Sequence, residues 1–391
     1  ARQALLNRGR LTAVIVSVAI AVAIGVATPL FAADRTWATS SGNWGTGANW
    51  GGSEPASGDN AIISNGGTAT VNQNGEVAAN VYLGTTAGTS GSITQSSGTL
   101  TVGTMYVGQG AGSSGTYTYS GGTLSATTIS TGGTGSITCA PANPWSVGVR
   151  NLAVQAGGDL TLTSSTFSVG LSNGQLSIAS GGSLTLNQSQ IYLRSASPLN
   201  LAEDAFIGGS GGVLTFMIQG TQTLPSHTYD AIILVCPEDT SNRGTLSQQG
   251  AVTVNALLRV GAVSRPATYL TNNHSLDING DFKIDNSVSE AYFGSSVVSV
   301  GGSFTNTNGT FDKGTSTVTF DATTTGKTIT SSADPFHNVA FNGVGGGWTL
   351  VDGLTAAGSF SMANGSLDTN GKNVSVSGSF SVTGGTYHQD G

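Results

Sequence analysis

The sequence predicts an all-β protein, a right-handed parallel β-solenoid (β-helix) with coils of roughly 20–24 residues, following an N-terminal signal or anchor helix. Three observations lead to this fold class. Glycine is abundant, with 59 of 391 residues, while only 8% of the residues are charged. Short runs alternate apolar and hydroxyl residues, which is the two-residue period of a strand. Blocks of sequence also recur at a constant offset, which is typical of repeat architectures.

The N-terminal segment resembles an export signal. Residues 1–10 contain three arginines and no acid, and residues 11–31 are almost entirely apolar. Cleavage after Ala32 or Ala33 would release a mature chain. The apolar run is also long enough to remain as an uncleaved signal anchor, so residues 11–31 are the only segment expected to contact a membrane. In either case we expect an extracellular or cell-surface protein.

A 24-residue repeat follows at residues 81–138. Three blocks recur at an offset of 24 and keep one register, which predicts stacked coils of equal length. The paired blocks are Val81–Gly84 with Met105–Gly108, Ser90–Thr94 with Ser114–Thr118, and Ser96–Leu100 with Ser120–Leu124.

The middle of the chain carries a smaller unit, Gly-x-Leu-Thr/Ser-apolar, as at residues 158–162 and 182–186. Its two large apolar residues are separated by one hydroxyl residue, so a strand places both on one face. We expect the apolar residues of this unit, and those of the 24-residue repeat, to point inward. They are Leu100, Val102, Leu124, Leu160, Leu162, Leu184 and Leu186.

The C-terminal part repeats a different motif, Gly-x-Phe, beginning at Gly280, Gly302, Gly358 and Gly378. The offsets are 22, 56 and 20, and the gap of 56 fits two longer coils or an insertion. An antiparallel sandwich is the alternative, since it also contains short alternating strands. The solenoid is favoured because a sandwich does not require a constant register across successive units.

These patterns divide the chain into five parts. They are a signal peptide or anchor at 1–33, a Trp-rich cap at 34–80, the repeat solenoid at 81–138, a divergent β module at 139–250, and a C-terminal β repeat region at 251–391. The sequence opens without methionine and ends at Gly391 in mid-pattern, so we expect a fragment whose C-terminal region is truncated. We also expect the open strand edges after Tyr387 to favour self-association.

Two stretches resemble a known family. Residues 36–50 contain Trp37, Trp44 and Trp50, and residues 55–63 contain a Pro-x-x-x-Asp segment. Together with the tyrosine and glycine repeats they resemble bacterial exported passengers of the autotransporter-associated β-strand repeat type, over roughly residues 36–130. Residues 275–391 look like a related class of bacterial surface repeats. The resemblance implies a secreted or surface-displayed β-helical passenger without assigned catalysis.

The three tryptophans have two interpretations. Large rings can cover the open end of a solenoid core, which is the structural interpretation. Alternatively, Trp37, Trp44 and Trp50 form an exposed platform that stacks on carbohydrate. The sequence leaves both open.

Cys139 and Cys236 are a candidate disulfide in an oxidising compartment. Their separation corresponds to about four coils, or about 19 Å of stacking, whereas a disulfide needs Cα atoms within about 7 Å. The bond is therefore expected only if the intervening segment returns on itself.

Two segments carry polar residues that catalysis or metal binding would require. Residues 194–243 contain Arg194, Glu203, Asp204, His227, Asp230, Glu238, Asp239 and Arg243, but adjacent acids on a strand point to opposite faces. Residues 277–285 resemble part of a calcium loop but lack its glycine and its bidentate acid. We therefore predict no cofactor, no metal site and no catalytic residues.

Charge constrains the partners. The formal net charge is −7 and no basic cluster is present, so we expect no nucleic-acid partner. The sequence favours a secreted or cell-surface structural or adhesive solenoid without catalytic activity, which binds carbohydrate or itself. The alternatives are an extracellular polysaccharide-acting enzyme and a glycan-binding module.

Overall fold

The computed structural model describes residues 33–139, 146–170, 173–195, 197–217, 220–236, 244–261 and 266–389. The expected signal or anchor segment lies, apart from residue 33, outside the described residues. Residues 32–391 form one compact unit. Among the described residues, no helix is both long and apolar enough to span a membrane.

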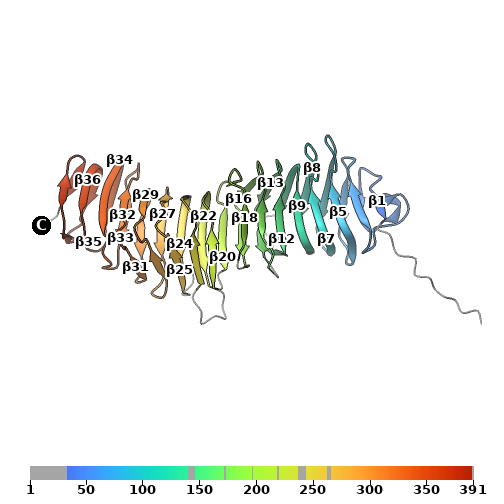
Figure 1. Cartoon of the computed structure of the whole chain (residues 1–391). Helices are drawn as coiled ribbons and strands as arrows, with labels where there is room; N and C mark the ends of the chain where they lie inside the picture. Colours follow the sequence, from blue (N-terminus) through green and yellow to red (C-terminus); the bar gives the residue numbers. More distant parts are fainter. Residues whose placement is uncertain are drawn as a thin grey trace, which may run out of the picture. The chain divides into compact units, whose positions relative to one another are not determined.

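The chain folds as a parallel β-solenoid of about 14 turns with coils of about 23 residues. Successive coils stack in sequence order from blue to red (Figure 1). Every strand pairing in the described part of the chain is parallel, for example β8 with β10 and β13 with β16. The predicted fold class is confirmed, and the antiparallel sandwich is excluded because it requires antiparallel pairs. The one described helical element is the short 3-10 helix η1 (Gly47–Trp50).

Two sheets, A and B, form the faces of the first coils. Sheet A contains β1 (Asp34–Thr36), β3 (Asn60–Ile63), β5 (Glu76–Leu83), β7 (Thr99–Val107), β9 (Thr123–Thr131), β12 (Asn151–Val154), β15 (Leu176–Ile178) and β18 (Leu199–Leu201). Sheet B contains β2 (Ser41–Asn43), β4 (Thr68–Val71), β6 (Ser90–Gln95), β8 (Ser114–Tyr119), β10 (Thr134–Cys139), β13 (Asp159–Thr163), β16 (Ser183–Asn187) and β19 (Phe206–Gly208).

Sheet C runs from the middle of the chain to its C-terminal part. It contains β11 (Ser146–Val149), β14 (Thr166–Val169), β17 (Gln190–Leu193), β20 (Val213–Met217), β22 (His227–Val235), β24 (Val252–Val260), β26 (Leu276–Ile278), β27 (Asp281–Ile284), β29 (Val297–Val300), β30 (Phe304–Asn306), β32 (Thr317–Phe320), β33 (Lys327–Thr330), β34 (Asn338–Leu350), β36 (Phe360–Asp368), β38 (Phe380–Val382) and β39 (Thr386–His388).

Two smaller sheets complete the later coils. Sheet D contains β21 (Thr221–Leu224), β23 (Gly244–Gln248), β25 (Ala267–Leu270), β28 (Glu290–Tyr292) and β31 (Thr310–Asp312). Sheet E contains β35 (Leu354–Ala356) and β37 (Val374–Val376).

The 24-residue sequence repeat sets the register of the paired strands, because residues 24 apart lie opposite each other. Leu100 lies opposite Leu124, and Val81 lies opposite Met105. All seven residues expected to point inward are buried, with exposed fractions of at most 5%. Alternate side chains of each strand thus fill one continuous core, because side chains of a strand point to opposite faces in turn.

The Gly-x-Phe motif does not mark one column of the solenoid. Phe282 pairs with Phe304, and Phe304 pairs with Ile329 in the next coil. Phe360 instead pairs with Val339 of the preceding coil and with Phe380 of the next one, on another face of the solenoid. The expectation of two longer coils or an insertion between Gly302 and Gly358 is therefore wrong, because the motif moves to a different strand of the coil.

The ladders are interrupted near residue 210. Sheet A ends at β18 and sheet B ends at β19, whereas sheet C continues from β20 to β22 and sheet D begins at β21. The coils thus stay hydrogen-bonded on one face while two faces lose their pairing. A surface groove lies beside β19, the last strand of sheet B.

The candidate disulfide is not present. Cys139 and Cys236 are buried and are not joined to each other. Cys139 ends β10 and Cys236 follows β22, about four coils further along a stack that does not return on itself. At about 4.8 Å per coil the thiols lie beyond disulfide reach. Cys139 Sγ instead lies 3.3 Å from Ser165 Oγ, and burial raises the pKa of this thiol.

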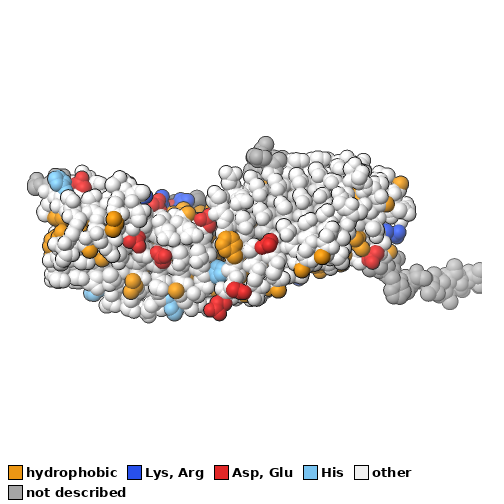
Figure 2. Space-filling view, turned by 90° about the horizontal axis from the view of Figure 1, so that it is seen from above, with side chains coloured by type: hydrophobic (Ala, Val, Ile, Leu, Met, Phe, Trp, Pro, Cys, Tyr) orange, Lys and Arg blue, Asp and Glu red, His pale blue; other side chains and the backbone are white. Residues whose placement is uncertain are grey.

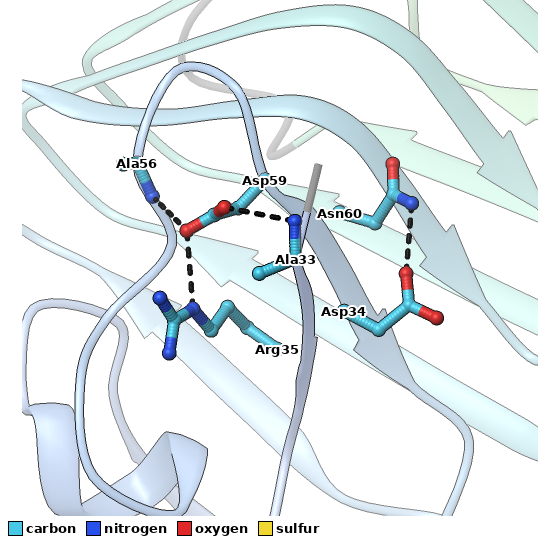
Figure 3. A network of polar contacts seen from close by, with 6 residues as sticks. All are labelled: Ala33, Asp34, Arg35, Ala56, Asp59 and Asn60. Atoms are coloured by element: carbon cyan, nitrogen blue, oxygen red, sulfur yellow. Dashed lines mark hydrogen bonds and ion pairs between the residues drawn. The ribbon is translucent and has the colours of Figure 1, made fainter. Parts of the chain in front are cut away.

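Asp59 attaches the first strand to the next coil (Figure 3). Its carboxylate accepts hydrogen bonds from Ala33 N, Ala56 N and Arg35 Nε, each at 3.1 Å. Burial alone would raise the pKa of Asp59, but these bonds together lower it. Asp59 is the acid of the Pro-x-x-x-Asp segment, so this part of the motif has a structural role in the fold.

Replacing this acid with alanine, D59A, is expected to destabilise the first coils by about 2 kcal/mol, because hydrogen bonds to charged groups contribute about 1.5–3 kcal/mol. The measurement is urea unfolding followed by tryptophan fluorescence, with exposed Ser57 replaced (S57A) as the control. Since the folded pKa is lowered, the contribution is complete above the unfolded pKa of about 4 and is lost as pH falls through the folded pKa. Equal stability of D59A and S57A at pH 7 would contradict this role.

Candidate functional site

The three tryptophans of the N-terminal cap form a buried cluster. Trp50 packs edge-on against Trp37 and Trp44, with ring centroids 4.8 Å apart in both pairs. Trp50 Nε1 donates a hydrogen bond of 2.6 Å to the backbone oxygen of Trp44. The rings are 0–4% exposed. The glycan-binding interpretation of these three residues is therefore wrong, because buried rings offer no face to a sugar, and the structural interpretation accounts for them.

A groove of about 780 Å³ lies where the sheet B ladder ends. Its walls come from the loop between β18 and β19, from β19 itself, and from the first residues of β22 and β24. β19 is the last strand of sheet B, so its outer edge has no strand partner among the described residues. Figure 2 shows apolar, acidic and histidine side chains close together near the middle of the stack.

Phe206 provides the exposed aromatic surface of this groove. In the register of sheet B it lies opposite Ser183, at a position that Ser, Thr or Asp occupies in the preceding coils. Its side chain is 53% exposed. The ring lies over Gly208, where an added Cβ would come within 2.4 Å of the ring carbon Cζ. Glycine at 208 thus leaves room for the ring along the strand.

The two acids of the groove differ in their environment. Asp204 Oδ2 accepts hydrogen bonds from Ser180 Oγ at 2.9 Å and from Gly181 N at 3.0 Å. This carboxylate therefore fastens a turn of the preceding coil. Glu203 is exposed beside it at the rim of the groove.

His227 begins β22 and lines the same groove. Burial lowers the pKa of His227, although hydrogen bonds with the backbone of Ala205 and Ser226 oppose this effect. The imidazole also contacts the ring of Tyr229 edge-on, with centroids 5.7 Å apart. The lowered pKa favours the neutral form of the imidazole.

The structure unites only part of the polar segment at 194–243. Glu203, Asp204 and His227 line the groove, while Asp230 accepts a hydrogen bond of 2.9 Å from Gly212 N. Glu238, Asp239 and Arg243 lie outside the described residues. Phe206 was missed by sequence reasoning. The sequence feature that could have revealed it is an aromatic residue at a repeat position that otherwise carries Ser, Thr or Asp.

The acids of the calcium-like segment bind other coils individually. Asp277 Oδ1 accepts a hydrogen bond of 2.6 Å from Ser299 Oγ, and Asp281 Oδ1 accepts one of 2.9 Å from Ser303 N. Asp285 pairs with Arg259. In the described part of the chain, no group of three or more His, Cys, Asp or Glu side chains is arranged to hold a metal ion.

Sheet B presents a second candidate surface, which we call the hydroxyl face. It consists of the outward side chains of β4, β6, β8, β10, β13 and β16, and it carries two main columns of Ser and Thr. The first column is Thr68, Ser92, Thr116, Ser136, Thr161 and Thr185, and the second is Thr70, Thr94, Thr118, Thr138, Thr163 and Asn187.

Comparisons with known proteins identify no relative: no family model, curated protein or solved structure matches the chain. The groove and the hydroxyl face are therefore the two surfaces from which a function can be inferred.

The lowered pKa of His227 has a measurable consequence for stability. The folded pKa lies below the unfolded value of about 6.5, so the unfolded chain binds more protons between the two values and stability decreases as pH falls below about 6.5. We expect the melting temperature of H227Q to decrease less than that of the wild type between pH 7.5 and pH 5. Parallel melting curves across this range would contradict the burial of a neutral imidazole.

Proposed function

We propose that the chain is a secreted or cell-surface solenoid with a structural or adhesive role, and that it holds a neutral glycan in the groove beside Phe206. The basic and apolar N-terminal pattern supports export. The resemblance to exported β-strand repeat passengers supports display on a bacterial surface. The low charge of the chain supports a neutral partner, and Figure 2 shows how thinly charged side chains are spread over the face in view.

The exposed ring of Phe206 is the observation that carries this proposal. A ring that is 53% exposed and borders a groove of about 780 Å³ can pack against the C–H face of a pyranose. The volume lies within the range of about 300–1,000 Å³ that is usual for ligand sites. Thr228, Thr253 and Asn255 provide hydroxyl and amide groups along the same groove.

A binding role fits the two acids better than hydrolysis does. Glycoside hydrolases need two carboxyl groups placed on either side of the scissile bond, one acting as acid and the other as base or nucleophile. Here Asp204 is held by Ser180 and Gly181, so Glu203 is the only carboxylate lining the groove that has no hydrogen bond within the described residues. A single carboxylate suits recognition of sugar hydroxyls.

The test is retention of the purified chain on immobilised neutral glycans. F206A is expected to lose retention, and F206Y is expected to keep it, because an aromatic face remains. Phe380 is a matched control, since its ring is 50% exposed on another part of the solenoid. F380A should therefore bind as the wild type does, and retention should be the same at low and high salt.

Two results would contradict the proposal. Equal retention of F206A and wild type would remove the groove from the binding site. Turnover of an oligosaccharide by wild type that is lost in E203Q would assign the groove to the enzyme alternative.

A further inference from the structure

The hydroxyl face has an ordered array of side chains that the groove does not explain. The sheet B strands β4, β6, β8, β10 and β13 each contribute a Thr-x-Thr or Ser-x-Thr unit whose middle residue is buried. In β8 and β13, for example, Tyr117 and Leu162 point into the core while the flanking threonines point outward. Parallel register then repeats the same pair of hydroxyls on every coil.

These hydroxyls are available to a partner. Over the described part of the chain, no hydroxyl in either column up to Thr185 forms a hydrogen bond with another protein group. Sheet A differs, because Asn60 Nδ2 donates to Asp34 Oδ1 at 2.8 Å and Asn80 Nδ2 donates to Asn60 Oδ1 at 3.0 Å. Asn60 and Asn80 of sheet A thus bind side chains of the neighbouring coil, whereas the hydroxyls of the two columns do not.

The array is regular in two directions. Neighbouring coils repeat at about 4.8 Å along the stack, and alternate residues of a strand repeat at about 6.6 Å across it. Threonine is branched at Cβ and has few allowed rotamers, so the hydroxyl and methyl groups of successive coils point in repeated directions. Such a surface is already ordered before a partner binds, which lowers the entropic cost of binding.

The face is almost uncharged. Asp159 is the only ionisable side chain among the outward residues of its six strands, and it accepts a hydrogen bond from Ser183 Oγ at 2.5 Å in the border column. The same outward positions carry no aromatic ring, unlike the groove. A neutral partner with hydrogen-bonding groups repeated in two directions is therefore the best match, and a sugar that needs ring stacking is a poorer one.

We propose that the hydroxyl face binds ice. An ice surface is neutral, presents both hydrogen-bond donors and acceptors, and repeats its oxygens in two directions on a scale similar to that of the array. The hydroxyls would bond to surface water while the methyl groups exclude mobile water between the rows. Each further coil adds one more row in register. This inference does not depend on the glycan site, because the two surfaces share no residue.

The experiment is partition of the whole chain into a growing ice phase, together with a measurement of thermal hysteresis. The test variant is T118Y/T138Y, which places bulky rings at the centre of the second column. The control is T101Y, an outward threonine of β7 in sheet A. Far-ultraviolet circular dichroism of each variant verifies that the solenoid is intact.

Wild type, T101Y and F206A are expected to enter the ice, and T118Y/T138Y is expected to be excluded from it to the level of a protein that does not bind ice. Exclusion of the wild type, or equal loss by T101Y and T118Y/T138Y, would overturn the proposal. Retention of wild type but not T118Y/T138Y on crystalline cellulose or chitin, without partition into ice, would assign the face to a solid polysaccharide and also overturn it.

Discussion

The parallel hydrogen-bonded ladder between successive coils is the constraint on which the rest of the structure depends. It places equivalent residues directly above one another, so each side chain meets its own counterpart at about 4.8 Å. Tyr82 and Tyr106 stack in this way, with ring centroids 4.9 Å apart and an interplanar angle of 2°. Equivalent charges would meet at the same distance and repel each other. The low content of charged residues, 8%, keeps such contacts few.

The same constraint explains where the two candidate surfaces lie. While sheet B is unbroken, its outward residues repeat as uniform columns and form the hydroxyl face. At β19 the ladder ends on this face but continues from β20 to β22 in sheet C, so the coils remain attached without closing the surface. The groove and its unlike residues, Phe206 and His227, occur at this interruption. The regular ladder of sheet B produces an extended face, and the end of this ladder at β19 leaves a concave site.

The fold class, the coil length and the inward residues could be predicted from the sequence, because they depend on local periodicity that a single chain displays. Leu100 and Leu124 are one example, with a constant offset and a buried position in both coils. The face that a motif occupies was harder to predict, since Phe304 and Phe360 share a motif but lie in different columns. The groove could not be predicted, because it depends on which sheets stop near residue 210 and not on a recognisable cluster of residues. The burial of Trp50 could not be predicted either, because a buried cap and an exposed carbohydrate platform have the same amino-acid composition and differ only in packing.

Distances between spin labels along one column of the hydroxyl face test the in-register ladder most directly. Labels at Thr70 paired in turn with Thr138, Thr163 and Asn187 are separated by three, four and five coils. The account predicts that the measured distance increases by about 4.8 Å with each coil, while the sequence separation increases by more than twenty residues. Distances that do not increase steadily along this column would contradict the parallel solenoid.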